Sequence, residues 1–451
     1  MNMPPKPEAR PRHVSLARYV RLFRRDILSA QPAHLYRAKM AEFRTPFFRS
    51  FLLNQPALVR QILIDRPELF PKSARISEGL RPLLGRSVFL TNGDEWARQR
   101  RIINPAFEGG RVREQFPAMQ AAADGVVARL TESSPAPVEV EALMAHGAAD
   151  VIFRTLFSLP IEDTLAARVF SAFQTYQRRQ PILNLGAFIP LPRWVPRLIG
   201  PGARRAAADI RGAIGDLVTR RLAEIDAGTA PDDLATKIMT MTDPETGGSF
   251  DRDEMIDQVA IFFLAGHETS AAALAWALFL LASHPEVQEE AAAEADRFAA
   301  DPSFAALAKL QTIRGVWREA LRLYPPVPMM VRTSVQKERF RNRDIPAGAQ
   351  IVVSPWHLHR HPDLWDRPDE FDPARQYPPG QFIPFSAGPR VCPGAGFAMA
   401  EGPLFLCRIL AAFRLRDVPR QRPMPIAYLT VRSRDGIWLR ITPRCQPERE
   451  V

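Results

Sequence analysis

The sequence predicts a mainly α-helical protein with a small β part, and three observations support this fold class. The longest candidate helix covers residues 252–283 and would extend about 48 Å at 1.5 Å per residue. Residues 111–230 alternate Ala-, Arg- and Glu-rich helical patterns with proline breaks. Short apolar runs separated by turn residues at 331–355 and 411–445 are typical of strands. No Gly/Ser-rich linker or internal repeat divides the 451 residues.

The first part of the chain predicts short elements. Residues 12–30 alternate basic and apolar positions and indicate a short helix, and residues 40–53 indicate a small β region. A further helix is expected from about Pro56 to Asp65. Residues 181–202 combine apolar side chains with several prolines, which excludes one long helix and favours a loop or lid.

Composition narrows the location and the partners. Residues 1–30 form a basic, proline-rich segment without the apolar region of a secretory signal, so we expect no transmembrane anchor. Three cysteines, Cys392, Cys407 and Cys445, indicate no disulfide framework, and we expect a cytoplasmic protein. The net charge of +11 comes from scattered arginines with no basic run interleaved with aromatics, so no nucleic-acid partner is expected.

A helix is expected after the turn at Asn92-Gly93, with Asp94 as its N-cap. Trp96 and Arg100 would then lie one helical turn apart on the same face. Such a pair is often ordinary surface packing, so its meaning depends on the other motifs.

The helix at residues 252–283 has a clear beginning and end in the sequence. Asp251 followed by Glu254 is a good start, and His284 followed by proline is a stop. The segment is apolar enough to suggest a transmembrane helix, but the polar residues 267–269 lie in its middle. We therefore expect a buried central helix.

One cysteine lies in a loop that leads into a helix. Phe385, Gly388, Arg390, Cys392 and Gly394 are spaced within the sequence FSAGPRVCPGAG, and a helix-favouring run follows. Unpaired backbone N–H groups and the positive end of the helix dipole favour a thiolate there over a thiol. The glycines allow a flat molecule to approach the backbone closely. The expected guest is a metal cofactor with anionic groups.

This spacing resembles the haem-binding signature F-x-x-G-x-R-x-C-x-G of the cytochrome P450 family, and the resemblance covers roughly residues 40–440. It implies the cytochrome P450 fold, a single large domain at residues 31–451 around a buried haem. The cofactor would be heme b (iron protoporphyrin IX), with Cys392 as the axial ligand of the iron. Phe385 would belong to the cofactor-binding loop.

The resemblance also assigns cationic side chains to the haem. The W-x-x-x-R pair of Trp96 and Arg100 is similar to a family motif that hydrogen-bonds a propionate. Arg332, which follows the break at Tyr324-Pro325-Pro326, and Arg390 in the cysteine loop would also contact the propionates.

The sequence from Ala265 to Thr269 is similar to the family's A-G-x-[DE]-T motif on the other face of the haem. Ala265 and Gly266 would leave room for dioxygen and substrate, with Gly266 beside the cofactor. Glu268 and Thr269 would relay protons for oxygen activation. The alternative is a threonine bonded to its own helical turn and a glutamate in a structural ion pair.

Glu319 and Arg322 form an E-x-x-R pair, which alone is a common helix ion pair. Here it resembles the family's buried ion network, completed by Arg375 of a later P-x-R segment. The following Gln376 departs from the phenylalanine often found there. All three are expected to be structural. The alternating His357, His359 and His361 match the family's H-R-x-P segment rather than a metal site.

The substrate is expected to be an apolar small molecule, but the sequence fits fatty acids, terpenes, steroids or alkanes equally well. The expected pocket residues come from the central helix, the segment after Pro326 and the C-terminal hairpins: Phe262, Phe263, Ala265, Val327, Met329 and Ile426.

The resemblance implies a monooxygenase that inserts one atom of O2 into its substrate by hydroxylation or epoxidation. No flavin or iron–sulfur module is recognised in the chain, so we expect electrons from NAD(P)H through a ferredoxin- or flavodoxin-type donor with its reductase. Two alternatives stay open: a peroxide-driven peroxygenase, and a haem-thiolate binding or sensing protein without turnover.

Overall fold

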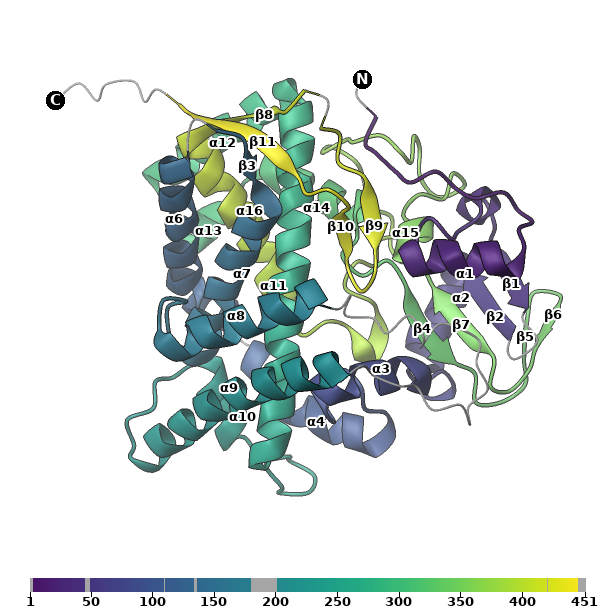
Figure 1. The fold of residues 1–451 in the computed structure, drawn as a ribbon, viewed down its shortest axis with the longest axis horizontal. Coiled ribbons are helices and arrows are strands. Elements are labelled where there is room, and N and C mark those ends of the chain that lie inside the picture. Colours follow the sequence, from purple (N-terminus) through teal and green to yellow (C-terminus); the bar gives the residue numbers. More distant parts are fainter. Residues whose placement is uncertain are drawn as a thin grey trace.

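The computed structural model describes residues 3–44, 49–108, 110–133, 136–179, 201–419 and 421–444, and it has a helical part and a smaller β-rich part (Figure 1). The expected lid at 181–202 lies almost entirely outside these residues. The helices are α1 (Leu16–Arg25), α2 (Pro56–Arg60), α3 (Ala74–Leu84), α4 (Gly93–Phe107), α5 (Arg111–Glu114), α6 (Phe116–Ser133), α7 (Val140–Phe157), α8 (Thr164–Arg179), α9 (Pro201–Asp226), α10 (Leu234–Thr240), α11 (Arg252–Ser283), α12 (Pro285–Ala300), α13 (Phe304–Leu307), α14 (Gln311–Leu323), α15 (Pro355–Leu358) and α16 (Ala395–Ala412). The mainly α-helical fold class is confirmed.

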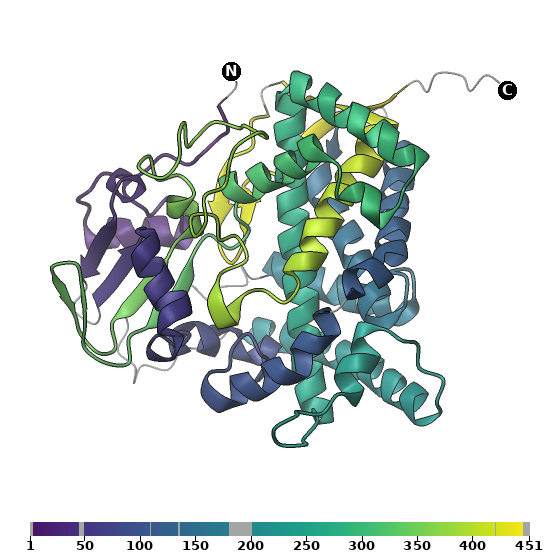
Figure 2. The same ribbon diagram turned by 180° about the vertical axis from the view of Figure 1, so that it is seen from behind.

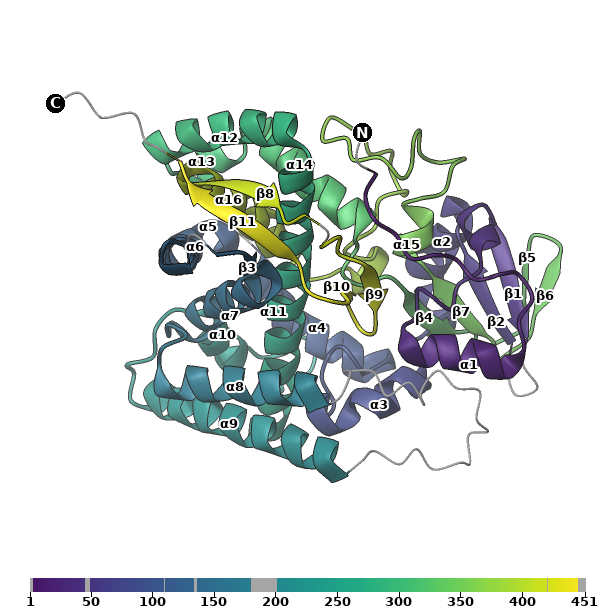
Figure 3. The same cartoon turned by 45° about the horizontal axis from the view of Figure 1, so that its top comes forward.

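The β part consists of small sheets formed by β1 (Met40–Arg44), β2 (Arg49–Leu53), β3 (Val138–Glu139), β4 (Met330–Thr333), β5 (Glu338–Phe340), β6 (Arg343–Ile345), β7 (Gln350–Val353), β8 (Phe413–Asp417), β9 (Pro425–Ala427), β10 (Val431–Ser433) and β11 (Trp438–Pro443). The largest has the order β1-β2-β7-β4, and its β2–β7 pair is parallel. The β8–β11 pair lies across one end of the helical part, against α16 (Figure 3). β9 and β10 form a separate antiparallel hairpin.

The central helix α11 has the bounds that the sequence indicates. Asp251 accepts a hydrogen bond from the backbone N–H of Glu254, and the Glu254 side chain accepts one from the backbone N–H of Asp251, so the helix begins with a capping box. α11 packs against α7, α9, α14 and α16, and Figure 2 shows α16 beside it. α11 and α16 are both long and apolar enough to cross a bilayer. In α11, however, 78% of the apolar 18-residue stretch that meets this condition is buried inside the protein. This burial agrees with a central core helix.

The basic N-terminal segment lies on the body of the protein. The hydroxyl of Tyr324, at the end of α14, donates a hydrogen bond of 3.0 Å to the carbonyl of Pro5. Lys6 forms an ion pair with Asp369. The first residues are therefore held against the loop region that follows α14 and α15.

The helix expected from about Pro56 to Asp65 is present, as α2 to Arg60 and then as a π-helical turn at Gln61–Asp65. One local expectation needs correction. Asp94 is not the N-cap of α4, because the helix begins at Gly93 and the capping position is Asn92. The Asn92 side chain is instead used in tertiary contacts, accepting from the backbone N–H of Lys72 and from Arg390.

Candidate active site

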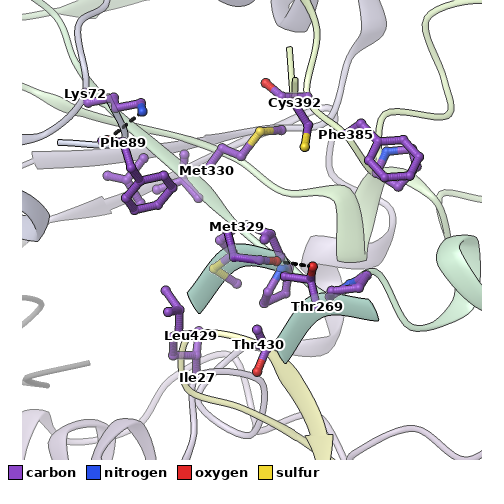
Figure 4. Close-up of a pocket in the computed structure, with 18 of the residues that line it drawn as sticks. Ile27, Lys72, Phe89, Thr269, Met329, Met330, Phe385, Cys392, Leu429 and Thr430 are labelled. Carbon is purple, nitrogen blue, oxygen red and sulfur yellow. Dashed lines mark hydrogen bonds between the residues drawn. The ribbon is translucent and has the colours of Figure 1, made fainter. Parts of the chain in front are cut away.

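A cavity of about 890 Å³ lies between α11 and the loop that precedes α16. Figure 4 shows Cys392 on one side of this cavity and Thr269, from α11, on the other. Between them the lining is mostly apolar, with contributions from α4, α11, the segment before β4 and the tip of the β9–β10 hairpin.

The cysteine loop is held by backbone geometry. The N–H of Cys392 donates to the carbonyl of Phe385 at 2.9 Å, and the N–H of Ala395 donates to the carbonyl of Cys392 at 3.3 Å as α16 begins. Gly388 has a φ of +69°, and a Cβ there would lie 2.0 Å from the carbonyl oxygen of Leu63. Only glycine fits that position, because both the backbone angle and the contact exclude a side chain.

The Cys392 thiol is accessible from the cavity that it lines. Burial raises its pKa, while the backbone N–H of Gly394 and the Arg100 guanidinium lower it. Desolvation is the largest of these effects, so the start of α16 does not by itself lower the pKa of this thiol in the way that the sequence suggests. A thiolate here needs a cation on its cavity side.

Cationic side chains gather at one wall of the cavity. Arg390 stacks over the ring of Trp96 at 4.1 Å from the ring centroid and donates to the carbonyl of Thr91 at 3.2 Å. Arg332 is buried, and its one hydrogen bond in the described part of the chain goes to the carbonyl of its neighbour Val331, at 3.2 Å. Burial lowers the pKa of Arg332 to about 10, and burial together with nearby arginines lowers that of Arg390 to about 10.

Lys72 is a fourth cation at this wall, beside Arg100, Arg332 and Arg390, and sequence reasoning missed it. Its Nζ donates to the carbonyl of Phe89 at 2.6 Å, and its backbone pairs with that of Arg332. Burial lowers its pKa well below the ordinary value, and the three arginines lower it further. A lysine after an irregular loop gives no local signal, and tertiary contacts with β4 and with Asn92 bring it to the site.

In the described part of the chain, these four cations have no carboxylate partner. Arg332, Arg390 and Lys72 donate to carbonyl or amide oxygens, and Arg100 Nε has no hydrogen-bond partner there. Buried cations without counter-charges are costly unless a ligand supplies the negative charge. The wall therefore fits a ligand with anionic groups, such as the two propionates of the expected haem.

The opposite wall holds the acid and the hydroxyl of the central helix. The Thr269 hydroxyl donates to the carbonyl of Ala265 at 2.5 Å, a bond within its own turn. Glu268 Oε1 accepts from the Thr430 hydroxyl at 2.8 Å, whereas Glu268 Oε2 has no partner in the described part of the chain. Burial raises the pKa of Glu268.

Gly266 has a packing role in addition to its place at the cavity. A Cβ at Gly266 would lie 2.3 Å from Cδ1 of Ile152 on α7, so glycine lets the two helices approach closely. His267, next to it, faces the protein core: its Nδ1 lies 2.7 Å from the carbonyl of Phe263, and burial lowers its pKa to about 4.

The pocket expectations divide into two groups. Phe262, Ala265, Val327 and Met329 line the cavity. Phe263 and Ile426 do not, and these two assignments are wrong. Phe263 packs into the core, 4.9 Å from Phe153 and 4.6 Å from Phe173 between ring centroids, because it lies on another side of α11. The hairpin reaches the cavity through its tip, Tyr428, Leu429 and Thr430, rather than through β9.

The three residues of the expected ion network are together. Arg322 Nε lies 2.6 Å and Arg375 Nε lies 3.3 Å from Glu319 Oε1, and all three side chains are buried. Arg322 also donates to the carbonyls of His359, Pro368 and Glu370. The charges are thus compensated within the protein, as expected for a structural role.

The alternating histidines also bond within the protein. His357 Nδ1 lies 2.8 Å from Ser354 Oγ, and His359 Nε2 accepts from the backbone N–H of Ile383 at 3.0 Å. His361 Nδ1 accepts from the backbone N–H of Asp363 at 3.2 Å. Burial lowers the pKa values of His357 and His359 to about 3, so both rings are neutral.

Comparison with known proteins agrees with this geometry. The family model described as cytochrome P450 matches residues 34–437. The chain is 33% identical to cyclooctat-9-en-7-ol 5-monooxygenase of Streptomyces melanosporofaciens, covering 88% of this chain and 87% of that protein. It is 30% identical to cyclooctatin synthase of the same organism, covering 90% and 89%. The crystal structure of the cytochrome P450DA heme domain has the same fold, with a TM-score of 0.81, 24% identity and 98% of each chain covered.

Proposed function

Because the chain belongs to the cytochrome P450 family and is a haem b monooxygenase, we propose that it hydroxylates or epoxidises a cyclic, largely apolar small molecule. Each turnover would consume the substrate, one O2, two electrons and two protons, and would release the oxygenated product and one water. We propose that the electrons come from NAD(P)H through a separate ferredoxin- or flavodoxin-type protein and its reductase. One observation carries the proposal: Cys392 faces Thr269 across an apolar cavity that has four cationic side chains at one wall.

The cysteine and the cations would hold the cofactor. When bound, the haem supplies the activation of dioxygen, which no side chain of this protein can perform. Cys392 would ligate the iron, and the positive metal would compensate the thiolate charge that burial otherwise disfavours. Arg100, Arg332, Arg390 and Lys72 would bind the propionates, which would provide anionic partners for the buried Arg332 and the three half-buried cations.

Glu268 and Thr269 would supply protons on the substrate side. The Thr269 hydroxyl, now bonded to Ala265, can rotate to donate into the cavity, and Glu268 lies next to it on the same helix. The raised pKa of Glu268 lets its carboxyl hold a proton closer to neutral pH than an exposed glutamate would. Apolar residues around them exclude water from the reacting centre.

The substrate class follows from the lining and from the relatives. Phe262, Val327, Met329 and Leu429 present an apolar surface, and the methionine can adapt its shape. The name of one relative denotes oxidation of a cyclic unsaturated alcohol. We propose that a molecule of this kind, a cyclic hydrocarbon with few polar groups, is the substrate here.

The absorption spectrum of the reduced protein under carbon monoxide tests the proposal first. A thiolate-ligated Soret band, strongly red-shifted from that of a histidine-ligated haem, is the expected result, and Cys392→Ser should abolish it. A histidine-type band or no haem would overturn the proposal. Titration with cyclic terpenoid alcohols and with fatty acids of matched size should then give spin-state shifts with the former.

Thr269→Ala separates the monooxygenase from the two alternatives. With NADPH and a surrogate ferredoxin system, this variant should release hydrogen peroxide in place of product. A protein that only binds ligands would consume no electrons with substrate, and a peroxygenase would turn over equally well with added peroxide before and after the change.

A further inference from the structure

The C-terminal hairpin touches both the cavity and its acid. Its tip residues Tyr428 and Leu429 line the cavity, and the next residue, Thr430, holds Glu268 through the 2.8 Å hydrogen bond. Figure 4 shows Leu429 and Thr430 at the same edge of the cavity as Thr269. Thr430 is buried, so its hydroxyl fixes the direction of one carboxyl oxygen of Glu268.

Arg432, two residues further on, lies between two carboxyl groups. Its Nε is 3.0 Å from Glu141 Oε1, on α7, and 3.8 Å from Glu268 Oε1. The backbone N–H of Ser433 donates to the other oxygen of Glu141 at 3.4 Å. One guanidinium therefore lies within ion-pair distance of two carboxyl groups. Water can bridge polar groups that are too far apart for a direct hydrogen bond.

Exposure rises along this row of groups. The side chain of Glu268 is 4% exposed, that of Glu141 is 15% and that of Arg432 is 32%. The row thus leads from the cavity wall to solvent. His267 does not belong to this row of groups, because its ring packs against Phe170 and Phe173.

We propose that the hairpin forms the proton supply of the site: Arg432 and Thr430 position Glu268, and Glu141 is the outer acid that returns a proton to it. This rests on the proposed function, because Glu268 must first deliver a proton to the cavity. The Glu141 carboxyl then loses its proton to the Glu268 carboxylate through water, and solvent protonates Glu141 again. Arg432 stays charged throughout, since a guanidinium does not release its proton.

The charges around Glu141 agree with this role. Burial raises its pKa to about 7, Arg432 lowers it, and Glu139 and Glu268 raise it. Glu139 itself caps α7 by accepting from the backbone N–H groups of Glu141 and Ala142. A carboxyl with this pKa exchanges protons with solvent near neutral pH, as an outer donor must.

The test compares Arg432→Gln and Glu141→Gln with Arg434→Gln as the matched control. Arg434 follows the same hairpin but pairs with Asp435 at the surface. In the haem-loaded protein with a surrogate ferredoxin system, we expect both test variants to lose about tenfold in dioxygen-driven turnover, with a larger solvent deuterium isotope effect. Arg434→Gln should stay within about twofold of the parent, and Arg432→Lys should recover most of the rate.

Two further readouts separate proton supply from a structural role. Peroxide-driven turnover and the substrate dissociation constant should be unchanged in Arg432→Gln and Glu141→Gln, because peroxide brings its own protons. Dioxygen-driven turnover should fall above pH 7 in the parent and become flatter in Glu141→Gln, because Glu141 is protonated below its pKa and ionised above it.

The proposal would be overturned if Arg432→Gln and Glu141→Gln lost turnover equally with dioxygen and with peroxide. Turnover rates like that of Arg434→Gln would also overturn it. If Arg432→Gln does not load haem, Glu141→Gln decides alone, because it keeps the size of the side chain. A parent without the thiolate-type band would instead overturn the proposed function, so the two failures differ.

Discussion

Two clusters of arginines, one around Glu319 and one at the cavity wall, differ in how their charge is compensated. Around Glu319, every nitrogen of Arg322 donates to the Glu319 carboxylate or to a backbone carbonyl. At the cavity wall, the Arg332 side chain donates to the carbonyl of its neighbour Val331 and to no carboxylate among the described residues. Burial lowers the pKa values of Arg332 and Arg390 to about 10.

The difference distinguishes a structural cluster from a binding site. A network whose donors and acceptors all have partners within the protein stabilises the fold but leaves no group free to bind a ligand. A cluster that the protein leaves incomplete destabilises the empty site and gains the missing interactions when an anionic ligand binds. The same residue types thus predict opposite responses to mutation.

The largest effect is expected from Arg322→Met. This change removes one of the two arginines that pair with the buried Glu319 carboxylate. The free energy of unfolding should fall by about 3–5 kcal/mol. Chemical denaturation of the haem-free protein measures it, with Arg314→Met, at the start of the same helix, as control. A loss no greater than that of the control would mean that the network does not support the fold.

Arg332→Met should affect haem binding rather than the stability of the haem-free protein. Removing an uncompensated buried cation should leave the haem-free protein as stable as the parent or more stable. Haem dissociation should become about tenfold to hundredfold faster, since a charge-assisted bond to a propionate contributes about 1.5–3 kcal/mol. Transfer of haem to an excess of acceptor protein measures the rate, and Arg60→Met, in an exposed ion pair with Asp65, is the control. Unchanged transfer would contradict the assignment.

Lys72→Met should weaken haem retention less, by about threefold to tenfold, because a lysine offers a single point charge. In the haem-free protein the folded state lowers the pKa of Lys72, so the unfolded state binds more protons. The free energy of unfolding should therefore rise with pH up to the ordinary lysine pKa, and Lys72→Met should reduce that rise. Denaturation between pH 7 and 10 tests this sign.

Glu401→Gln should have the smallest effect at neutral pH. Burial raises the pKa of Glu401 to about 8, so its carboxyl group is mostly protonated and uncharged at neutral pH. The Ser270 hydroxyl donates to Glu401 Oε2 at 2.8 Å. The parent should lose stability as pH rises from the ordinary glutamate pKa towards 8, because only the folded state keeps the proton. Glu401→Gln should not show this loss. If the free energy of unfolding changes equally with pH in the parent and in the variant, the prediction is wrong.

Local sequence determined several features of this protein without reference to its tertiary structure. The capping box of Asp251 and Glu254 and the stop at His284 define α11, because helix ends depend on neighbouring residues. The glycine spacing of the cysteine loop and the i, i+3 pair of Glu319 and Arg322 are also local, so the sequence placed them correctly. The family motifs then indicated which cavity these elements surround.

Only the tertiary structure decided which side of a buried element meets the cavity. α11 is apolar all round, so its sequence could not separate Phe262, at the cavity, from Phe263, in the core. Lys72 joins the cations through pairing with β4, and Arg432 joins Glu268 and Glu141 from positions distant in the chain. The physical reason is the same in each case: local periodicity determines an element, whereas charge pairing and burial depend on residues that folding brings together.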